Sequence, residues 1–318
     1  MVNIPRLDLN LYINGNAKQR KQFSDDIGNA FNQTGFVTIT NHGLDKDLID
    51  KLYEDVKALF ALPDAVKLKY EIPGLAGQRG YTGKEKETAK GFKTPDLKEF
   101  WQIGQTVTDD DPIRNDYPDN VLIKELPSFN ATTFQIYENL EFAGIHLLKA
   151  IAVYLGLPEN YFDTNVHNGN SILRTLHYFP IKDPDLLPED AVRAGAHEDI
   201  NLITLLIGAS ADGLEVLTRE NKWFPVKAYG EDLVVNVGDM LQRLTNNKLK
   251  STTHRVVNPT RELMGYSRYS VPFFLHPKST MDLTCLTECI DDNHPKLYDD
   301  ITAGEYLDER LREIGLKK

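Results

Sequence analysis

Residues 172–178, Ile-Leu-Arg-Thr-Leu-His-Tyr, begin the part of the chain that decides its fold. The stretch is rich in residues that favour strands, and further short stretches of the same kind follow at 202–207, 214–217, 223–226, 233–237, 254–257 and 266–275. Turn-forming pairs such as Gly238-Asp239 and Asn246-Asn247 separate them. Many short strands at this spacing are typical of a β sandwich or barrel, and a jelly roll (the cupin-like double-stranded β-helix) fits the pattern.

The first half of the chain has a different pattern, in which helices dominate. Apolar residues recur at helical spacing in 17–33, in 45–62 and from Phe134 to Leu155, where Gly156 ends the run. Asp45 is expected to cap the second of these helices, and 4–9 and 36–40 read as short strands. Residues 70–105 mix glycine with lysine and show no period, which favours either a solvated loop or a mobile segment beside a substrate entrance.

These patterns predict an α+β protein with one domain over residues 1–318. Residues 1–165 would form a helical region with edge strands, packed on a jelly-roll catalytic core of residues 166–290. Residues 291–318 would add a C-terminal helix, with 303–315 as its helical stretch. The chain contains no linker rich in proline, glycine or serine that would mark a domain boundary.

Composition excludes several classes of function. The chain has 36 basic and 47 acidic residues, a formal net charge of −11, so nucleic acid is a poor candidate for the main partner. Its two cysteines, Cys285 and Cys289, are too few for a disulfide framework. No signal-peptide pattern and no apolar run of membrane-spanning length is present, so we expect no membrane partner and a cytoplasmic location.

A possible metal site is spread over two stretches. His197 and Asp199 are two residues apart, so in an extended strand their side chains point to the same face. His254 lies in a later strand-like stretch and can complete a set of two histidines and one carboxylate. Such a facial triad is typical of non-haem iron(II), but a hydrolytic zinc site can use the same ligand types. His42 is expected to be structural, and no metal role is assigned to His177, His276 or His294.

A second pair, Arg268 and Ser270, is again spaced by two along a strand. A guanidinium and a hydroxyl directed into a barrel form a two-point seat for a carboxylate. The simpler alternative is an arginine exposed on an edge strand or paired with an acidic side chain. Together with the candidate triad, the pair favours the carboxylate seat.

The chain resembles the isopenicillin N synthase-like family of 2-oxoglutarate- and iron(II)-dependent oxygenases. The resemblance rests on stretches whose order and spacing match the family along nearly the whole chain: Ile4–Leu9, Gly35-Phe36-Val37, Asn41-His42-Gly43, Leu173–Pro180, His197–Leu206, Val235–Asp239, Thr245-Asn246, Ser251–Val256 and Arg268-Tyr269-Ser270. Two departures are visible. Leu176 stands where many plant members have asparagine, and Phe179-Pro180 replaces a proline pair.

The resemblance implies the cofactors and their positions. It implies iron(II) held by His197, Asp199 and His254, with 2-oxoglutarate seated on Arg268 and Ser270 and contacted by the hydroxyl of Tyr178. It also implies dioxygen as the oxidant and release of succinate and carbon dioxide, with ascorbate as a possible reductant. The expected reaction is hydroxylation or desaturation of a small organic molecule.

Two other functions stay open from the sequence alone. The first is an iron-dependent oxidase on the same scaffold that does not use 2-oxoglutarate, because the penicillin-forming and ethylene-forming members also carry the Arg-x-Ser pair. The second is a metal-binding sensor without turnover. An oxidase would form product without succinate, and a sensor would keep its output when Asp199 is replaced by alanine.

The sequence gives only hints about the substrate. Cationic and aromatic side chains lie in the segment expected at the barrel mouth and beside the motif positions in the strands, and they suit an acidic or planar organic molecule. The candidate substrate residues are Arg79, Tyr81, Phe100, Trp101, Arg174 and Phe273.

Overall fold

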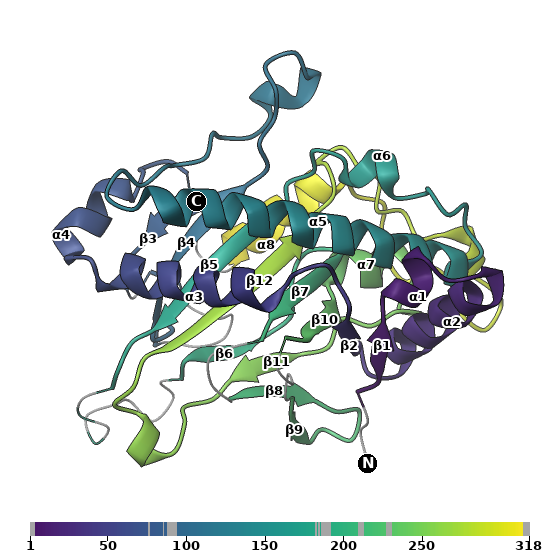
Figure 1. Ribbon diagram of the computed structural model, residues 1–318. Coiled ribbons are helices and arrows are strands. Elements are labelled where there is room, and N and C mark those ends of the chain that lie inside the picture. The colour runs from purple at the N-terminus through teal and green to yellow at the C-terminus, as the bar shows by residue number, and fades with distance from the viewer. Residues whose placement is uncertain are drawn as a thin grey trace.

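The computed structural model describes residues 4–313 apart from 76, 85, 88–93, 182, 184, 186–191, 209–212 and 227–230. Within this part of the chain, two β-sheets face each other and a layer of helices covers the larger one (Figure 1). The expected α+β architecture with a jelly-roll core is confirmed. No described helix is both long and apolar enough to cross a membrane.

The large sheet contains strands from both halves of the chain. Its order is β1-β2-β10-β7-β12-β5-β4-β3, and only β1 and β2 pair in parallel. The bounds are β1 (Arg6–Asp8), β2 (Phe36–Thr40), β3 (Gly80–Thr82), β4 (Lys98–Gly104), β5 (Ile172–Tyr178), β7 (Ile203–Ile207), β10 (Leu233–Val237) and β12 (Arg268–Leu275).

The small sheet is antiparallel and has the order β6-β11-β8-β9. Its strands are β6 (Ala194–His197), β8 (Leu214–Leu217), β9 (Trp223–Pro225) and β11 (His254–Val256). It lies across from the large sheet, on the side away from the long helix (Figure 1).

The helices pack mainly on the outer face of the large sheet. The bounds are α1 (Asn10–Ile13), α2 (Ala17–Gln33), α3 (Lys46–Ala61), α4 (Asp64–Lys67), α5 (Pro127–Leu155), α6 (Asp163–Val166), α7 (Asp239–Leu244) and α8 (Ala303–Glu313). The helix α5 runs across the sheet with α2 and α3 beside it (Figure 1). The predicted cap of α3 is confirmed, because the Asp45 carboxylate accepts a hydrogen bond from the Leu48 backbone N–H at 2.8 Å.

Alternation along the strands divides their side chains between two environments. In β5 and β12, odd-numbered residues such as Leu173 and Phe273 belong to the main hydrophobic core beneath the helices. Even-numbered residues such as Leu176 and Tyr178 face the small sheet, where they pack with Ala194 of β6. The space between the two sheets is therefore lined by even-numbered residues of these two strands.

The seven strands predicted after residue 170 are all confirmed, with bounds that differ by at most two residues. The expectation of a loop across 70–105 was wrong for β3 and β4, which continue the large sheet, while residues 76, 85 and 88–93 of that segment lie outside the described residues. An extended stretch was expected only around His197 and Asp199, and the start of β6 at Ala194 was not predicted, because Ala-Gly-Ala contains no strand-favouring residue. The C-terminal helix is described to Glu313, and its expected end at 315 lies outside the described residues.

Candidate metal centre and active site

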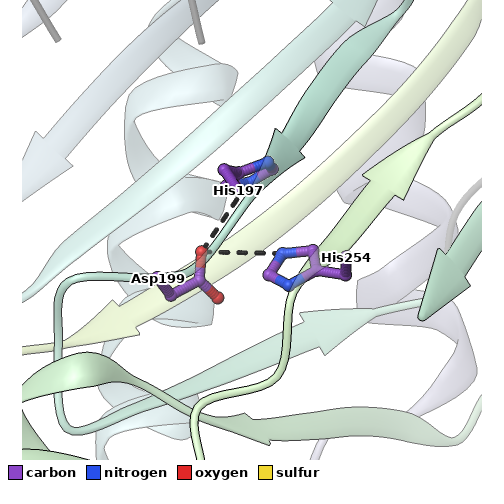
Figure 2. Close-up of side chains that lie close together, drawn as sticks. All are labelled: His197, Asp199 and His254. Atoms are coloured by element: carbon purple, nitrogen blue, oxygen red, sulfur yellow. Dashed lines mark ion pairs between the residues drawn. The ribbon is translucent and has the colours of Figure 1, made fainter. Parts of the chain in front are cut away.

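The three candidate ligands meet at one end of the small sheet. His197 is the last residue of β6 and lies opposite His254, the first residue of the neighbouring β11. Asp199 does not continue the strand, as the sequence had suggested, but follows in the turn after it. Its Oδ1 lies 3.9 Å from Nε2 of His197 and 3.7 Å from Nε2 of His254 (Figure 2). One potential ligand atom from each residue falls within 4.8 Å of the others.

Backbone carbonyl groups fix the orientation of both imidazoles. Nδ1 of His197 donates to the carbonyl of Gly195 at 2.7 Å, and Nδ1 of His254 donates to the carbonyl of Thr252 at 3.1 Å. In each ring the proton is therefore on Nδ1, and Nε2 keeps a lone pair directed toward Asp199. This is the tautomer that a metal ligand needs.

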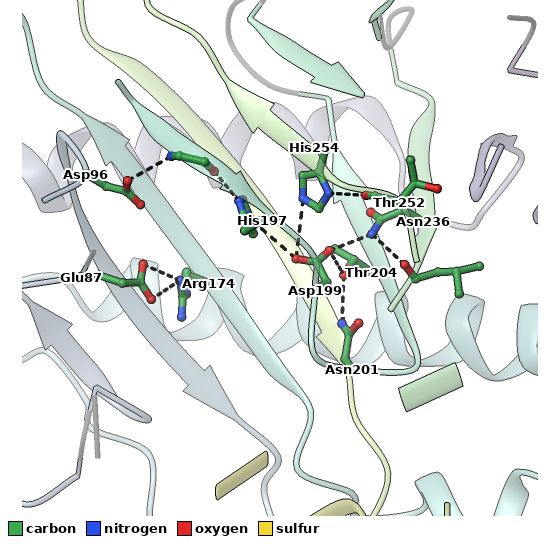
Figure 3. A network of polar contacts seen from close by, with 12 residues as sticks. Glu87, Asp96, Arg174, His197, Asp199, Asn201, Thr204, Asn236, Thr252 and His254 are labelled. Carbon is green, nitrogen blue, oxygen red and sulfur yellow. Dashed lines mark hydrogen bonds and ion pairs between the residues drawn. The ribbon is translucent and has the colours of Figure 1, made fainter. Parts of the chain in front are cut away.

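The other oxygen of Asp199 is held by neutral donors. Oδ2 accepts hydrogen bonds from Thr204 Oγ1 at 2.6 Å and from Asn236 Nδ2 at 2.8 Å (Figure 3). Asn201 in turn donates to Thr204 Oγ1 at 2.9 Å, which fixes the direction of the threonine hydroxyl. With Oδ2 held in this way, Oδ1 faces the two histidines.

Electrostatics favour the metal-binding protonation states of His197 and Asp199. Desolvation of the imidazole at the site, with a further contribution from the neighbouring His254, lowers the pKa of His197 to about 4, so its imidazole is neutral at physiological pH. Burial alone would raise the pKa of Asp199, but His254, His197 and the hydrogen bonds of Asn236 and Thr204 together lower it. Two neutral imidazoles and one carboxylate are the form of this donor set that binds a divalent cation.

The donor set fits iron(II). Two imidazole nitrogens and one carboxylate oxygen on one side of a metal leave the opposite positions open for other ligands. Asn236 and Thr204 hold the carboxylate by its far oxygen and leave the near one available. The sequence had left zinc as an alternative on ligand type alone, and the geometry of these three residues is compatible with either ion.

A cavity of about 450 Å³ opens beside the triad. His197 and Asp199 lie on one side of it, and β4, β5 and β12 contribute the opposite wall through Gln102, Arg174 and Phe274. The helix α8 closes part of the rim with Leu307 and Leu311. The cavity is thus bounded by the candidate metal centre, by the inner face of the large sheet and by the C-terminal helix.

Arg174 is the central residue of the wall opposite the triad. Its guanidinium lies 4.2 Å from the ring centre of Phe100 and 5.3 Å from that of Phe274. Nε donates to Gln102 Oε1 at 2.9 Å, and Nη1 lies 3.3 Å from both carboxylate oxygens of Glu87. These contacts hold the guanidinium between two rings and at the edge of the cavity.

The predicted carboxylate seat is buried between the sheets. Arg268 lies opposite Tyr178 in the ladder between β12 and β5, and its guanidinium carbon is 5.0 Å from the centre of the tyrosine ring. Ser270 is on the same side of β12, opposite Leu176. All three side chains of the seat are buried, but none of them is among the residues that line the 450 Å³ cavity.

The predicted substrate residues divide between two environments. Arg174 lines the cavity. Phe100 does not line it, but its ring lies against the Arg174 guanidinium. Trp101 and Phe273 are buried in the main core and do not line the cavity, because odd-numbered residues of β4 and β12 point toward the helices.

Two more predicted substrate residues also lie away from the cavity. Tyr81 is buried and donates its hydroxyl proton to Glu99 on the outer face of β4. Arg79 is buried against Gly104 and donates to Gln105 Oε1 at 2.9 Å.

Sequence reasoning missed several residues of the cavity wall. Phe274 and His276 occupy even positions at the end of β12 and just beyond it, whereas the predicted substrate residue of this strand is Phe273, at an odd position. Gln102 lies in β4, which had not been predicted as a strand. The period of two that links Arg268 and Ser270, extended along the same strand, would have identified positions 274 and 276.

Comparisons with known proteins agree with this geometry. Residues 169–277 match the family model of the 2OG-Fe(II) oxygenase superfamily, and residues 4–125 match that of the non-haem dioxygenase in morphine synthesis N-terminal region. The chain is 33% identical to the proline hydroxylase buaE of Petromyces alliaceus, with 98% of this chain and 99% of that protein covered.

Solved structures are similar over the whole chain. A protein of the 2OG-Fe(II) oxygenase family from Caulobacter crescentus is 44% identical, with a TM-score of 0.87 and coverage of 99% of this chain and 100% of that one. A full-length protein from Neurospora crassa, solved in complex with alpha-KG and thymine, is 28% identical, with a TM-score of 0.85 and 98% of each chain covered.

Proposed function

The chain belongs to the 2OG-Fe(II) oxygenase superfamily, and from this premise we propose that it oxidises a small organic molecule bound in the cavity beside His197, Asp199 and His254. As a non-haem iron(II)- and 2-oxoglutarate-dependent dioxygenase, it uses dioxygen and forms succinate and carbon dioxide. The observation that carries the proposal for the ligands is the position of Asp199 Oδ1, which faces Nε2 of both histidines.

The residues of the chain would divide the work as follows. Iron(II) bound at the triad supplies the oxidising chemistry once 2-oxoglutarate and dioxygen are present. Arg268, Ser270 and Tyr178 would hold the distal carboxylate of 2-oxoglutarate and orient it from the deep end of the inter-sheet space. Thr204 and Asn236 keep Asp199 ionised and aimed at the metal position.

The wall around Arg174 would bind the substrate. Gln102, Arg174 and His276 offer polar groups to the cavity, and Phe274 offers an apolar surface. His276 is buried, its Nδ1 has no hydrogen-bond partner among the described residues, and burial lowers its pKa to about 4, so it is neutral at physiological pH. Neutral groups such as the Gln102 amide and the His276 imidazole suit a polar, uncharged group on the substrate.

Charge pairing in the wall narrows the substrate class that the sequence suggested. Arg174 is paired with Glu87, Lys98 with Glu87 and Asp96, and Arg310 with Glu313. Because these cations already have carboxylate partners, the wall offers little excess positive charge to a second carboxylate. We therefore favour a planar or polar neutral molecule over a strongly acidic one.

The test is substrate-stimulated formation of succinate. The purified chain is incubated with iron(II), ascorbate, 2-oxoglutarate and a library of small polar and planar molecules, and succinate and oxidised product are measured together. The proposal would be supported by a compound that increases both succinate and oxidised product with the wild-type chain and increases neither with the Asp199→Ala variant. Product without succinate would instead identify an oxidase that does not use 2-oxoglutarate.

A further inference from the structure

The strand that carries His197 lies at the edge of the small sheet. Only β11 pairs with β6, so the other side of β6 has no strand partner among the described residues. The segment before β4 takes that place: the Leu97 N–H donates to the Val192 carbonyl at 3.3 Å, and the Gly195 N–H donates to Asp96 Oδ1 at 3.0 Å. The Asp96 side chain thus supplies the acceptor that a neighbouring strand would otherwise offer to the Gly195 N–H.

Gly195 also holds the imidazole of His197. Its N–H binds Asp96, and its carbonyl accepts the Nδ1 proton of His197 at 2.7 Å, so a line of hydrogen bonds runs from Asp96 to the metal ligand (Figure 3). The side chain of His197 is 40% exposed, against 10% for His254. Packing therefore constrains His197 less than His254, and the hydrogen bonds at Gly195 matter more for its orientation.

Asp96 is itself fixed by buried charge. Its Oδ2 lies 2.7 Å from Lys98 Nζ, and Lys98 also contacts Glu87 Oε2 at 2.6 Å. All three of these residues line the cavity. Glu87 also forms an ion pair with Arg174. With one oxygen held by Lys98, the other oxygen of Asp96 has a set direction toward Gly195.

We propose that Asp96 is a positioning residue for the metal ligand His197, acting through the backbone of Gly195. The inference rests on the proposed function, because it takes His197 as a ligand. Removing the acceptor at position 96 would release the outer edge of β6, widen the range of His197 orientations and weaken metal binding. In this proposal, Asp96 orients His197 through the oxygen that accepts the Gly195 N–H hydrogen bond, and not through its negative charge.

Two double variants separate the acceptor from the charge. Asp96→Asn with Lys98→Met removes the ion pair but keeps an amide oxygen for the Gly195 N–H, whereas Asp96→Ala with Lys98→Met removes both. Glu87 keeps its contact with Arg174 in each. The probe is Co(II), an air-stable substitute for iron(II), and its dissociation constant and visible absorption spectrum are measured in the presence of 2-oxoglutarate.

We expect the asparagine variant to bind Co(II) within about threefold of the wild type, and the alanine variant to bind at least about tenfold more weakly with an altered spectrum. Equal affinities in the two double variants would overturn the inference, whether both are normal or both are weak. Glu99→Gln is the matched control, because Glu99 is the neighbouring buried carboxylate of β4 and contacts Lys67 on the opposite face. It should lower thermal stability and leave Co(II) affinity unchanged.

A second measurement uses only the wild-type chain and so does not depend on whether a variant folds. In the wild-type chain, exchange of the Gly195 amide hydrogen is followed by NMR with and without the diamagnetic ion Zn(II). A bond to Asp96 predicts slow exchange that slows further when the ion fixes His197, and exchange as fast as that of an exposed edge amide would overturn the inference. Failure of the premise that His197 is a metal ligand looks different: the wild-type chain would bind neither metal ion, whereas a chain that binds metal but forms no succinate would contradict the proposed function alone.

Discussion

The two carboxylate oxygens of Asp199 have different partners, and this division prepares the side chain for a metal. Oδ2 is saturated by Thr204 and Asn236, while Oδ1 faces the two histidines. A carboxylate without these donors would rotate freely and would be harder to keep ionised at a buried site. The hydroxyl of Thr204 should therefore contribute to metal affinity although it does not touch the metal position.

Replacing Thr204 with valine tests this contribution. The substitution keeps the shape of the side chain and removes one hydrogen bond to Asp199, so we expect Co(II) affinity to fall by about tenfold. Isothermal titration calorimetry would measure it. Thr175→Val on β5 is the control: the Thr175 hydroxyl is equally buried but has no hydrogen-bond partner in the described part of the chain, so its loss should leave metal affinity unchanged. Equal losses in the two variants would contradict the assignment.

The neighbours Phe273 and Phe274 should respond to alanine in opposite ways. Phe273 is fully buried in the main core, and Phe273→Ala should lower the free energy of unfolding by about 3–5 kcal/mol, measured by urea denaturation. Phe274 lines the cavity and stacks near Arg174, so Phe274→Ala should mainly reduce substrate-stimulated succinate formation. The reverse result would show that the even-numbered face of β12 is not the substrate side.

At the scale of single residues, the sequence predicted the ligand set and Arg174 of the cavity wall, but not Phe274 or His276. The histidines and Asp199 belong to short motifs with recognisable spacing, and the structure brings them together. A period of two says which residues of a strand share a face, but not which face is the core when both carry apolar side chains. Phe273 and Phe274 are equally apolar, and only the helices packed on one side of β12 decide between them.

Among the elements, α5 shows how closely a helix lies on the large sheet. Gly144 faces Leu275 of β12 and Leu205 of β7, and a Cβ at this position would lie 2.4 Å from a methyl group of Leu275. Both leucines are fully buried and leave little room for movement. The glycine sets the distance between helix and sheet.

Gly144→Ala should accordingly destabilise the chain in spite of the better helix propensity of alanine. Overpacking of a filled core costs about 1–3 kcal/mol, which chemical denaturation would detect. Gly265→Ala is the matched control, because nothing lies within 4 Å of a Cβ at that position and its free energy of unfolding should change by less than about 0.5 kcal/mol. A Gly144→Ala variant as stable as the control would mean that α5 can shift away from the sheet.

The same helix carries a carboxyl group whose ionisation opposes folding. Burial, with a smaller contribution from Glu138, raises the pKa of Glu141 from 4.5 to about 7. Between these values the folded state binds more protons than the unfolded state, so this group lowers stability as pH rises from about 4.5 to about 7. Glu141→Gln should therefore gain about 1–2 kcal/mol at pH 8 and almost nothing near pH 4.5. Denaturation at both pH values checks this, and a gain independent of pH would contradict it.

The strands that sequence analysis missed share a physical reason. In β4, Lys98 and Gln102 face the cavity and Glu99 is bound by Lys67, so buried polar groups obscure the apolar pattern of the strand. The strand β6 begins Ala-Gly-Ala, small residues that give no strand pattern, and Asp96 lies against it. The strands β5, β10 and β12 carry longer runs of strand-favouring residues and were predicted correctly, although β5 and β12 also line the cavity. Local patterns fail here where polar or small residues interrupt the run.

On the scale of the whole molecule, the two halves of the sequence form one sheet. The N-terminal strand β2 pairs with β10, and β4 pairs with β5, so strands from residues 1–165 flank those of the core on both sides. The helices α2, α3 and α5 cover the outer face of the same sheet. We propose that residues 1–318 fold as a single cooperative unit, although the turn and strand pattern places the catalytic residues in 166–290.

A fragment of residues 166–318 tests this proposal. Without the N-terminal half, β5 and β10 become open edges, and apolar side chains such as Leu173 and Phe273 lose the helices that cover them. Open edges next to an exposed apolar face favour association. We expect the fragment to aggregate or to show no cooperative thermal transition, whereas the full chain should unfold in one transition that moves to higher temperature with Co(II) and 2-oxoglutarate. A soluble fragment that unfolds cooperatively and binds Co(II) would show instead that the jelly roll is an independent domain and that the helical half is an addition to it.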